Sequence, residues 1–193
     1  MKQRVYRNFK VLVWIAIFLG MAGIWGCSSP YSINSPRYNV YEGEINHHRR
    51  VIQSEPDYIF QLLTNKETIA AICPQGTVVT YITPPPYDVG AIVETRIEHI
   101  FKLKWTSRVE DILPGSLIRL EFQEGLFEGG TELWELSKEE EGTLVSHTIV
   151  VDPKGVLGKA AWYLKARSKH DKMVEQFLDN LKHLAETGEL DTT

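Results

Sequence analysis

Alternation of apolar and polar residues predicts a series of short strands between residues 47 and 151. It is clearest in Ser116–Gln123, where Ile118, Leu120 and Phe122 share one face and mostly polar side chains occupy the other. This period of two is typical of a strand with one face on a core. Turn-forming Gly and Pro residues separate the predicted strands, which are His47–Ser54, Thr77–Thr83, Ala91–Phe101, Lys104–Leu113, Ser116–Gln123, Thr131–Ser137 and Thr143–Val151.

Three other segments have helical spacing. Pro56 suits the first turn of a short helix, and a second short helix is predicted over Lys66–Ile72, ending before Pro74. From about Lys154 to Glu186 there is no proline, which predicts one long helix with an irregular start around residues 155–158. Its apolar stripe comprises Leu157, Ala160, Ala161, Leu164, Val174, Phe177, Leu178, Leu181 and Leu184.

The predicted order is one strand, two short helices, six strands and a long helix, which is an α+β arrangement. An antiparallel sheet with one apolar face needs cover, and the final helix is the only large element left to supply it. We therefore expect a curved antiparallel sheet of six to seven strands wrapped around the C-terminal helix. If helix and sheet touch at both ends and separate in the middle, an apolar ligand cavity opens between them.

The first 26 residues predict a signal or membrane segment. Four basic residues lie within the first ten, and the 16 residues Val11–Gly26 carry no charge. That length falls between the apolar core of a secretory signal, about 7–15 residues, and a transmembrane helix of about 20. Ile24-Trp25-Gly26-Cys27 resembles the bacterial lipoprotein signal, although Trp25 stands where Ala or Ser is usual. The resemblance implies cleavage before Cys27 and lipidation of that cysteine.

Three interpretations of this segment stay open: a lipoprotein signal, an uncleaved anchor or ordinary signal, and a buried core segment. The first two predict a membrane-anchored domain in the cell envelope, outside the cytoplasm, and Ser28 favours the outer membrane where two membranes exist. Ser and Pro enrichment predicts an extended spacer over 27–41. The predicted organisation is completed by a folded domain over 42–187 and a tail over 188–193.

Charge and cysteine content narrow the functional classes. The chain has 21 Lys and Arg against 25 Asp and Glu. Without the four basic residues of the N-terminal segment, 17 remain against 25, a net charge near −8. This net charge disfavours binding to nucleic acid, which proteins bind through basic surfaces, and flat docking on anionic lipid.

If Cys27 is acylated, Cys73 has no disulfide partner and is predicted to be a small core residue.

Several segments resemble a known superfamily. EPDYIFQLLTN, AAICPQG, GGTELWELSKEEEGTLVSHTI and the closing helix, in this order, are similar to the START-like (SRPBCC) helix-grip superfamily of the polyketide cyclase/dehydrase and lipid-transport type. The similarity covers about residues 45–186, and Ile72 stands where many relatives carry Trp. It implies a cavity for a lipid, sterol, polyketide or quinone between sheet and helix. Some members catalyse cyclisation or dehydration, and many are carriers.

Alternation along the strands predicts that some polar side chains point toward the expected cavity. His99 and His147 each share the apolar face of their strand, and the apolar stripe of the long helix is interrupted near Ser168 and Asp171. A polar group inside an apolar cavity can act as a general acid or base, or orient a ligand. The residues expected to contact ligand are Val93, Thr95, Ile97, His99, Trp105, Phe122, Trp134, His147, Leu164, Ser168 and Asp171.

Within that set, His99, His147 and Asp171 are the candidates for catalysis. The alternative is structural. An inward histidine is usually a hydrogen-bonded core residue, aromatic residues suit an ordinary core equally well, and Asp171 is flanked by lysines that could hold it in solvent.

Other chemistry has no signal in the sequence. The histidines lack metal-ligand spacing, since His47 and His48 are adjacent on a strand and point to opposite faces. There is no nucleophile elbow and no phosphate-binding loop. We predict no metal and no cofactor. The glycine-rich segment 125–130 joins two strands. Its Leu126 and Phe127 either gate the cavity or touch lipid, or they fold back onto the core.

Three functions are compatible with these observations. The first is a membrane-tethered envelope protein that binds or carries a hydrophobic small molecule of the lipid, polyketide or quinone class. The second is a cyclase/dehydrase-type enzyme that acts on a lipophilic substrate and uses an inward histidine as general acid or base. The third is an interaction protein without a cavity.

Overall fold

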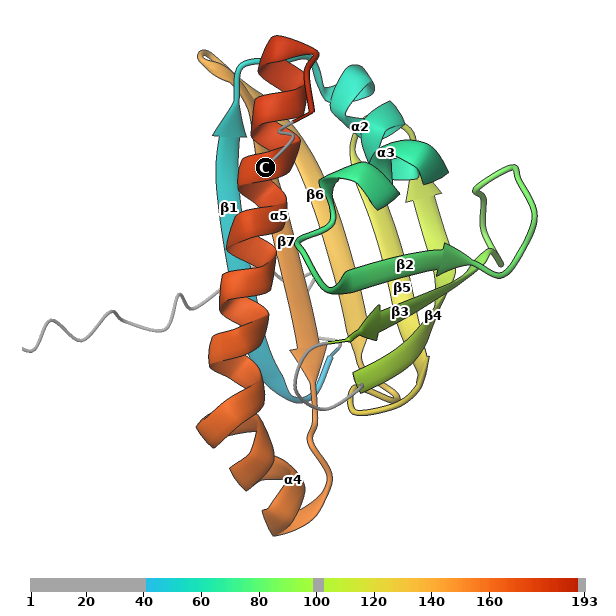
Figure 1. Cartoon of the computed structure of the whole chain (residues 1–193), viewed down its shortest axis with the longest axis vertical. Helices are drawn as coiled ribbons and strands as arrows, with labels where there is room; N and C mark the ends of the chain where they lie inside the picture. Colours follow the sequence, from blue (N-terminus) through green and yellow to red (C-terminus); the bar gives the residue numbers. More distant parts are fainter. Residues whose placement is uncertain (1–40, 99–102, 191–193) are drawn as a thin grey trace, which may run out of the picture. The chain divides into compact units, whose positions relative to one another are not determined.

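Seven strands form one antiparallel sheet in the computed structural model of the chain, which describes residues 41–98 and 103–190 (Figure 1). The strand order across the sheet is β1-β7-β6-β5-β4-β3-β2, so that the first and last strands pair with each other. The strands are β1 Glu44–Ile52, β2 Thr77–Tyr81, β3 Ile92–Ile97, β4 Leu103–Leu113, β5 Leu117–Glu124, β6 Thr131–Glu139 and β7 Gly142–Val151.

Every predicted strand is present, although β1 begins and ends earlier than the alternation indicated. Turns at Gly115, Gly129 and Gly142 connect β4 to β5, β5 to β6 and β6 to β7, as their Gly-containing dipeptides predicted. In β5, the inward residues Ile118 and Leu120 are buried, whereas the intervening Arg119 is only partly covered.

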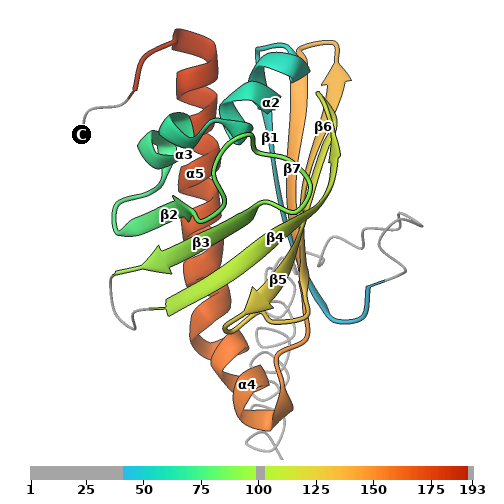
Figure 2. The same ribbon diagram turned by 90° about the vertical axis from the view of Figure 1, so that its right-hand side faces the viewer.

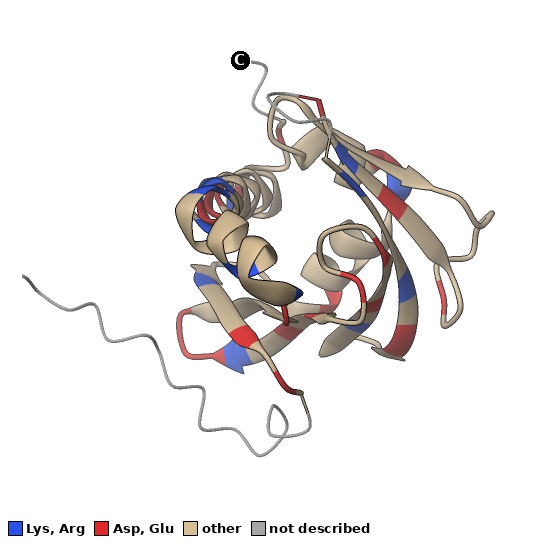
Figure 3. Ribbon diagram, turned by 90° about the horizontal axis from the view of Figure 1, so that it is seen from below, with Lys and Arg blue, Asp and Glu red and all other residues tan. Residues whose placement is uncertain are grey.

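Curvature of the sheet has a local cause in β4. The pairing of β4 with β5 shifts register between Thr106 and Ser107 and again between Val109 and Asp111. Such bulges bend a strand and increase its twist. The end-on view of Figure 3 shows the sheet curling around the C-terminal helix. The predicted fold class, an α+β helix-grip with a curved antiparallel sheet, is confirmed.

Two short helices, α2 Pro56–Thr64 and α3 Lys66–Ile72, follow β1 as predicted. Pro56 occupies the first turn of α2, where no backbone donor is needed. The side chain of Asn65 caps α3 by accepting a 2.8 Å hydrogen bond from the Thr68 amide. Cys73 follows α3 as a free thiol that packs against the core, and burial raises its pKa to about 11.

The C-terminal helix has three parts: α4 Gly155–Ala161, a π-helical turn η2 Trp162–Ala166, and α5 Arg167–Thr187. The irregularity predicted around residues 155–158 is therefore wrong in position, because it lies in η2. α5 ends at Gly188, whose φ of 75° is readily adopted by glycine. Figure 2 shows α5 alongside the sheet, with α2 and α3 near one end of it and α4 beyond the other.

The π turn changes which side chains face inward. Trp162 is completely buried, whereas Leu157 and Leu164 are 86% and 80% exposed. The apolar stripe predicted for residues 157–164 assumed an unbroken α-helical period, and a π turn inserts extra backbone that rotates the face. That part of the stripe is wrong, while its continuation through Val174, Leu178 and Leu181 is buried as predicted.

Buried apolar side chains gather in two clusters along the helix. The first joins α2, α3 and the sheet to α5 through Val174, Leu178 and Leu181. The second is mainly aromatic and contains Trp162, and Met173 packs against both clusters. The second cluster consists of Trp105, Phe122, Phe127, Ile149, Val151 and Trp162.

Some predictions fall on residues 1–40 and 99–102. The signal or anchor, Cys27, most of the spacer, and His99 therefore lie outside the described residues. Among the helices that the structure describes, none is both long enough and apolar enough to cross a bilayer.

Candidate ligand-binding site

A cavity of about 560 Å³ lies between the sheet and the C-terminal helix. Its sheet side is formed by Ile97 of β3 with Leu103 and Trp105 of β4, and its helix side includes Ala166 and Met173. This volume is within the range of about 300–1,000 Å³ that is usual for small-molecule sites. The predicted separation of sheet and helix is therefore present.

Two smaller hollows continue from this cavity under α5. One, of about 90 Å³, shares Trp105, Phe127 and Met173 with the large cavity. The other, of about 100 Å³, shares Trp134 and Phe177 with the first hollow. The shared walls make a row of three spaces from the surface toward α2 and α3. We call this row the central cavity.

Most of the residues expected to contact ligand lie on the walls of the central cavity. They come from five different strands, β3 to β7. Their role as ligand contacts stays a prediction. The residues in this position are Val93, Thr95, Ile97, Trp105, Phe122, Trp134 and His147.

Three helix residues of the predicted set do not line these spaces. Leu164 and Ser168 are exposed, which corrects their expected inward position, and the π turn is the reason. Asp171 faces β1, where its Oδ1 accepts a 2.6 Å hydrogen bond from the Asn46 amide. His99, another residue expected to contact ligand, is outside the described residues.

The loop between β5 and β6 closes one side of the large cavity. Phe127 is buried, and its ring centroid lies 5.3 Å from those of both Trp105 and Phe122. Gly125 permits this fold, because a Cβ there would lie 2.5 Å from the Lys104 carbonyl oxygen and its φ is +94°. Of the roles predicted for Phe127, folding back onto the core is confirmed, and the same ring also lines the cavity.

A carboxylate, an imidazole and an indole meet on the sheet wall. The Oε1 of Glu132 accepts a 2.9 Å hydrogen bond from Trp134 Nε1 and lies 3.0 Å from His147 Nε2. His147 is almost completely buried, and its Nδ1 has no hydrogen-bond partner among the described residues. An unpaired buried nitrogen costs free energy unless something binds it. His147 also lines the 90 Å³ hollow, so its side chain borders the central cavity.

A second set of polar residues, centred on Asn46, links β1 to α5 by hydrogen bonds, and we call it the β1–α5 tie. Asn46 Oδ1 lies 3.0 Å from His170 Nδ1 and 2.8 Å from His48 Nε2. Complete burial lowers the pKa of His170 well below its usual value, and nearby His147 and His48 lower it further. His170 is therefore neutral, and its Nδ1 donates to Asn46.

Acidic residues extend this tie along α5. His48 Nδ1 lies 2.6 Å from Glu175 Oε1, and Arg50 donates to Glu175 Oε2 at 2.7 Å while pairing with Asp179 at 2.8 Å. Partial burial raises the pKa of Glu175, but hydrogen bonds from His48 and Arg50 and the charge of Arg50 outweigh it. The pKa of Glu175 consequently lies below its ordinary value.

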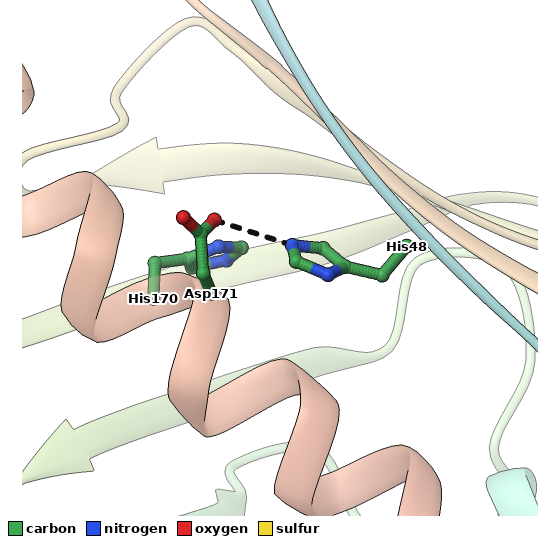
Figure 4. Close-up of side chains that lie close together, drawn as sticks. All are labelled: His48, His170 and Asp171. Atoms are coloured by element: carbon green, nitrogen blue, oxygen red, sulfur yellow. Dashed lines mark ion pairs between the residues drawn. The ribbon is translucent and has the colours of Figure 1, made fainter. Parts of the chain in front are cut away.

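Part of this tie resembles a metal-binding set. His48, His170 and Asp171 each offer one ligand atom, and these atoms lie within 4.8 Å of one another (Figure 4). Two imidazole nitrogens and a carboxylate oxygen are ligands that suit zinc or iron. In this structure His48 and Asp171 are 3.3 Å apart as an ion pair and all three contact Asn46. The arrangement joins strand to helix by hydrogen bonds.

Sequence reasoning missed Asn46, His48, Glu132 and His170. The sequence contains a pattern that could have identified most of these residues. Asn46, His48 and Arg50 alternate on one face of β1, and acids recur at Asp171, Glu175 and Asp179 on one face of α5. Matching polar stripes of this kind indicate two elements that pack against each other.

Comparison with known proteins identifies the fold. Neither a protein-family profile nor a curated protein sequence matches the chain. The Aha1 dimer from Colwellia psychrerythraea is similar in structure, with a TM-score of 0.58, 17% identity, and coverage of 76% of this chain and 98% of that one. A protein from Thermus thermophilus has a TM-score of 0.61 and 16% identity, covering 72% of this chain and 95% of that one.

A third solved structure agrees. The AHSA1-like protein from Aeromonas hydrophila has a TM-score of 0.53 and 13% identity, covering 78% of this chain and 97% of that one. At such identities the likeness concerns the fold alone. The likeness agrees with the helix-grip fold described above.

Proposed function

We propose that this protein binds a hydrophobic small molecule, of the lipid, polyketide or quinone class, in the central cavity and carries it in the cell envelope. The observation that supports this most directly is the 560 Å³ space between sheet and helix, walled by apolar side chains from both. An apolar ligand that leaves water gains roughly 25 cal/mol per Å² of buried surface. A space of this size also disfavours the alternative of an interaction protein without a cavity.

The membrane tether is the second part of the proposal. Its support is the basic and apolar pattern of residues 1–26 and the lipoprotein-like Cys27. Two or more acyl chains on that residue would hold the protein stably at a membrane, since each buried methylene contributes about 0.8 kcal/mol. A carrier held there stays close to a supply of apolar molecules.

Native mass spectrometry of protein purified from its own cells tests the ligand. We expect a co-purifying apolar small molecule in the wild-type protein. Ala166→Trp should reduce ligand occupancy at least about tenfold, because the new side chain fills the cavity at its helix wall. Ser168→Trp is the matched control, since Ser168 is exposed on the same helix and lines none of the described spaces.

Two results would contradict the ligand proposal: wild-type protein that carries no small molecule, or equal occupancy in the Ala166→Trp and Ser168→Trp variants. Metabolic labelling with palmitate tests the tether in the same cells. If Cys27 is lipidated, the wild-type protein should incorporate the label and Cys27→Ser should not. A wild-type protein in the membrane pellet that carries no label points to an uncleaved anchor instead.

The Glu132–His147 pair favours a second candidate, an enzyme of the cyclase/dehydrase type. A buried imidazole hydrogen-bonded to a carboxylate can accept a proton at its free nitrogen and return it elsewhere on the substrate. If this is correct, wild-type protein should convert the extracted ligand to a product that differs by the loss of water or by ring closure. Glu132→Gln should slow this conversion at least about a hundredfold, and unchanged ligand after incubation with wild-type protein eliminates the candidate.

A further inference from the structure

Three acidic and three basic side chains of the C-terminal helix lie on different faces of it. Asp171, Glu175 and Asp179 face β1, where they hold Asn46, His48 and Arg50. The cationic side chains Lys165, Lys169 and Lys172 instead line the 560 Å³ cavity. All three line the same space, Lys165 from the π turn η2 and Lys169 and Lys172 from α5.

The charge at this cavity is opposite to that of the chain. Three lysines and no Asp or Glu are among the described residues that line it. The chain as a whole has a net charge of −4, and residues 27–193 have a net charge near −8. The composition argued against flat docking on anionic lipid, but the fold places three lysines at the cavity.

The polar and the apolar side chains that line this cavity differ in how exposed they are. The three lysines are exposed and form a rim, whereas Trp105 and Phe127 are 6% and 5% exposed and form the floor. Lysine side chains of this kind lay their methylene stems on apolar surface and keep the charge in water. A ligand can therefore bury a chain on the aromatic floor and leave a charged group among the ammonium groups.

Building on the proposed function, we propose that the ligand is an anionic amphiphile, bound with its apolar chain inside the cavity and its carboxylate or phosphate group at the rim formed by Lys165, Lys169 and Lys172. Hydrogen bonds between an ammonium and an oxyanion are stronger than neutral ones. Because the rim is exposed, the attraction is screened by salt. A neutral chain of equal length keeps the apolar contacts and loses the rim contacts.

Displacement of the neutral fluorescent probe N-phenyl-1-naphthylamine tests this proposal with four competitors that share a sixteen-carbon chain: palmitate, hexadecyl phosphate, hexadecanol and hexadecyltrimethylammonium, all below their micelle concentrations. We expect both anions to bind about tenfold more tightly than hexadecanol, and the cation least tightly. Substituting all three rim lysines by Gln should weaken anion binding about tenfold and leave hexadecanol unchanged, since each exposed charge pair contributes modestly. High salt should have the same effect on the wild-type protein.

Lys159→Gln is the matched control, because Lys159 is exposed in α4 and lines none of the described spaces. If the triple variant is unfolded by circular dichroism, Lys172→Gln alone should still weaken anion binding about threefold. Whichever anion binds more tightly identifies the head group as carboxylate or phosphate. Equal affinity for palmitate and hexadecanol in wild-type protein overturns this inference and leaves the proposed function standing.

Two other outcomes separate this inference from the alternatives. If the probe and all four competitors fail to bind, the proposed function fails and this inference fails with it. If the rim substitutions change only sedimentation with anionic vesicles and leave palmitate affinity unchanged, the lysines serve a membrane surface, and the amphiphile assignment is overturned.

Discussion

Replacing Trp162 with Ala should lower the free energy of unfolding by about 3–5 kcal/mol. The side chain is completely buried, and its ring packs edge-on against Phe127 with centroids 5.8 Å apart. It is the buried side chain of η2 within the aromatic cluster. Its removal leaves a void that the rigid strands around it can fill only in part. Urea denaturation followed by circular dichroism measures the change.

Trp162→Phe is the control for this substitution. The indole Nε1 has no hydrogen-bond partner among the described residues, so its loss leaves no partner unsatisfied. We expect a change of less than about 1.5 kcal/mol, because Phe retains most of the apolar ring. A loss below about 1 kcal/mol for Trp162→Ala would show that η2 does not pack as described.

Stability should fall as the pH is lowered below about 6.5, through protonation of buried histidine. The folded protein holds His170 neutral, because burial lowers its pKa, whereas the unfolded chain protonates it near pH 6.5. Below that pH the unfolded state binds more protons than the folded state, so the free energy of unfolding decreases by up to about 1.4 kcal/mol per pH unit for this one group. His47, whose pKa burial lowers to about 4, acts in the same direction.

The variant His170→Gln isolates the contribution of His170. Glutamine keeps an amide donor for Asn46 Oδ1 and does not titrate. The slope of unfolding free energy against pH between 6.5 and 5 should become shallower by about one proton, while the other groups of the tie, His48, Asp171 and Glu175, remain. An identical slope in variant and wild type would mean that His170 is protonated in the folded protein.

The strands and short helices could be predicted because their signals are local. Ile118, Leu120 and Phe122 alternate with polar residues within one strand, and Pro56 and Pro74 bound the short helices. The helix-grip arrangement followed from the order of these elements, since only one helix was large enough to cover the sheet. None of these inferences required knowledge of a contact between distant residues.

The start of the long helix could not be predicted by the same reasoning. A search for the period of 3.6 residues favours Leu157 and Leu164, which are exposed, over Trp162, which is buried. The π turn places the largest apolar side chain of the segment inward, where it removes the most apolar surface from water. Tertiary packing thus overrides the helical period at this point.

The polar contacts of the site depend on sheet topology. Asn46 and His170 meet because β1 pairs with β7 and lies against α5, and they are 124 residues apart in the chain. His147 was predicted from strand parity, but Glu132 beside it was not, because the pairing of β6 with β7 brings these two strands together. Alternation along a strand predicts which face of the sheet a residue occupies, but it does not predict which residue lies beside it on the next strand.

The isolation of α4 has a consequence for hydrogen exchange. None of its residues is buried, and it lies beyond the end of the sheet (Figure 2). Its backbone hydrogen bonds therefore lack the packing that protects those of α5, where four side chains are buried. Amides in this segment should open locally at a small fraction of the global unfolding free energy. Since Ala161 lines the cavity, such fraying would widen the entrance without disturbing any strand.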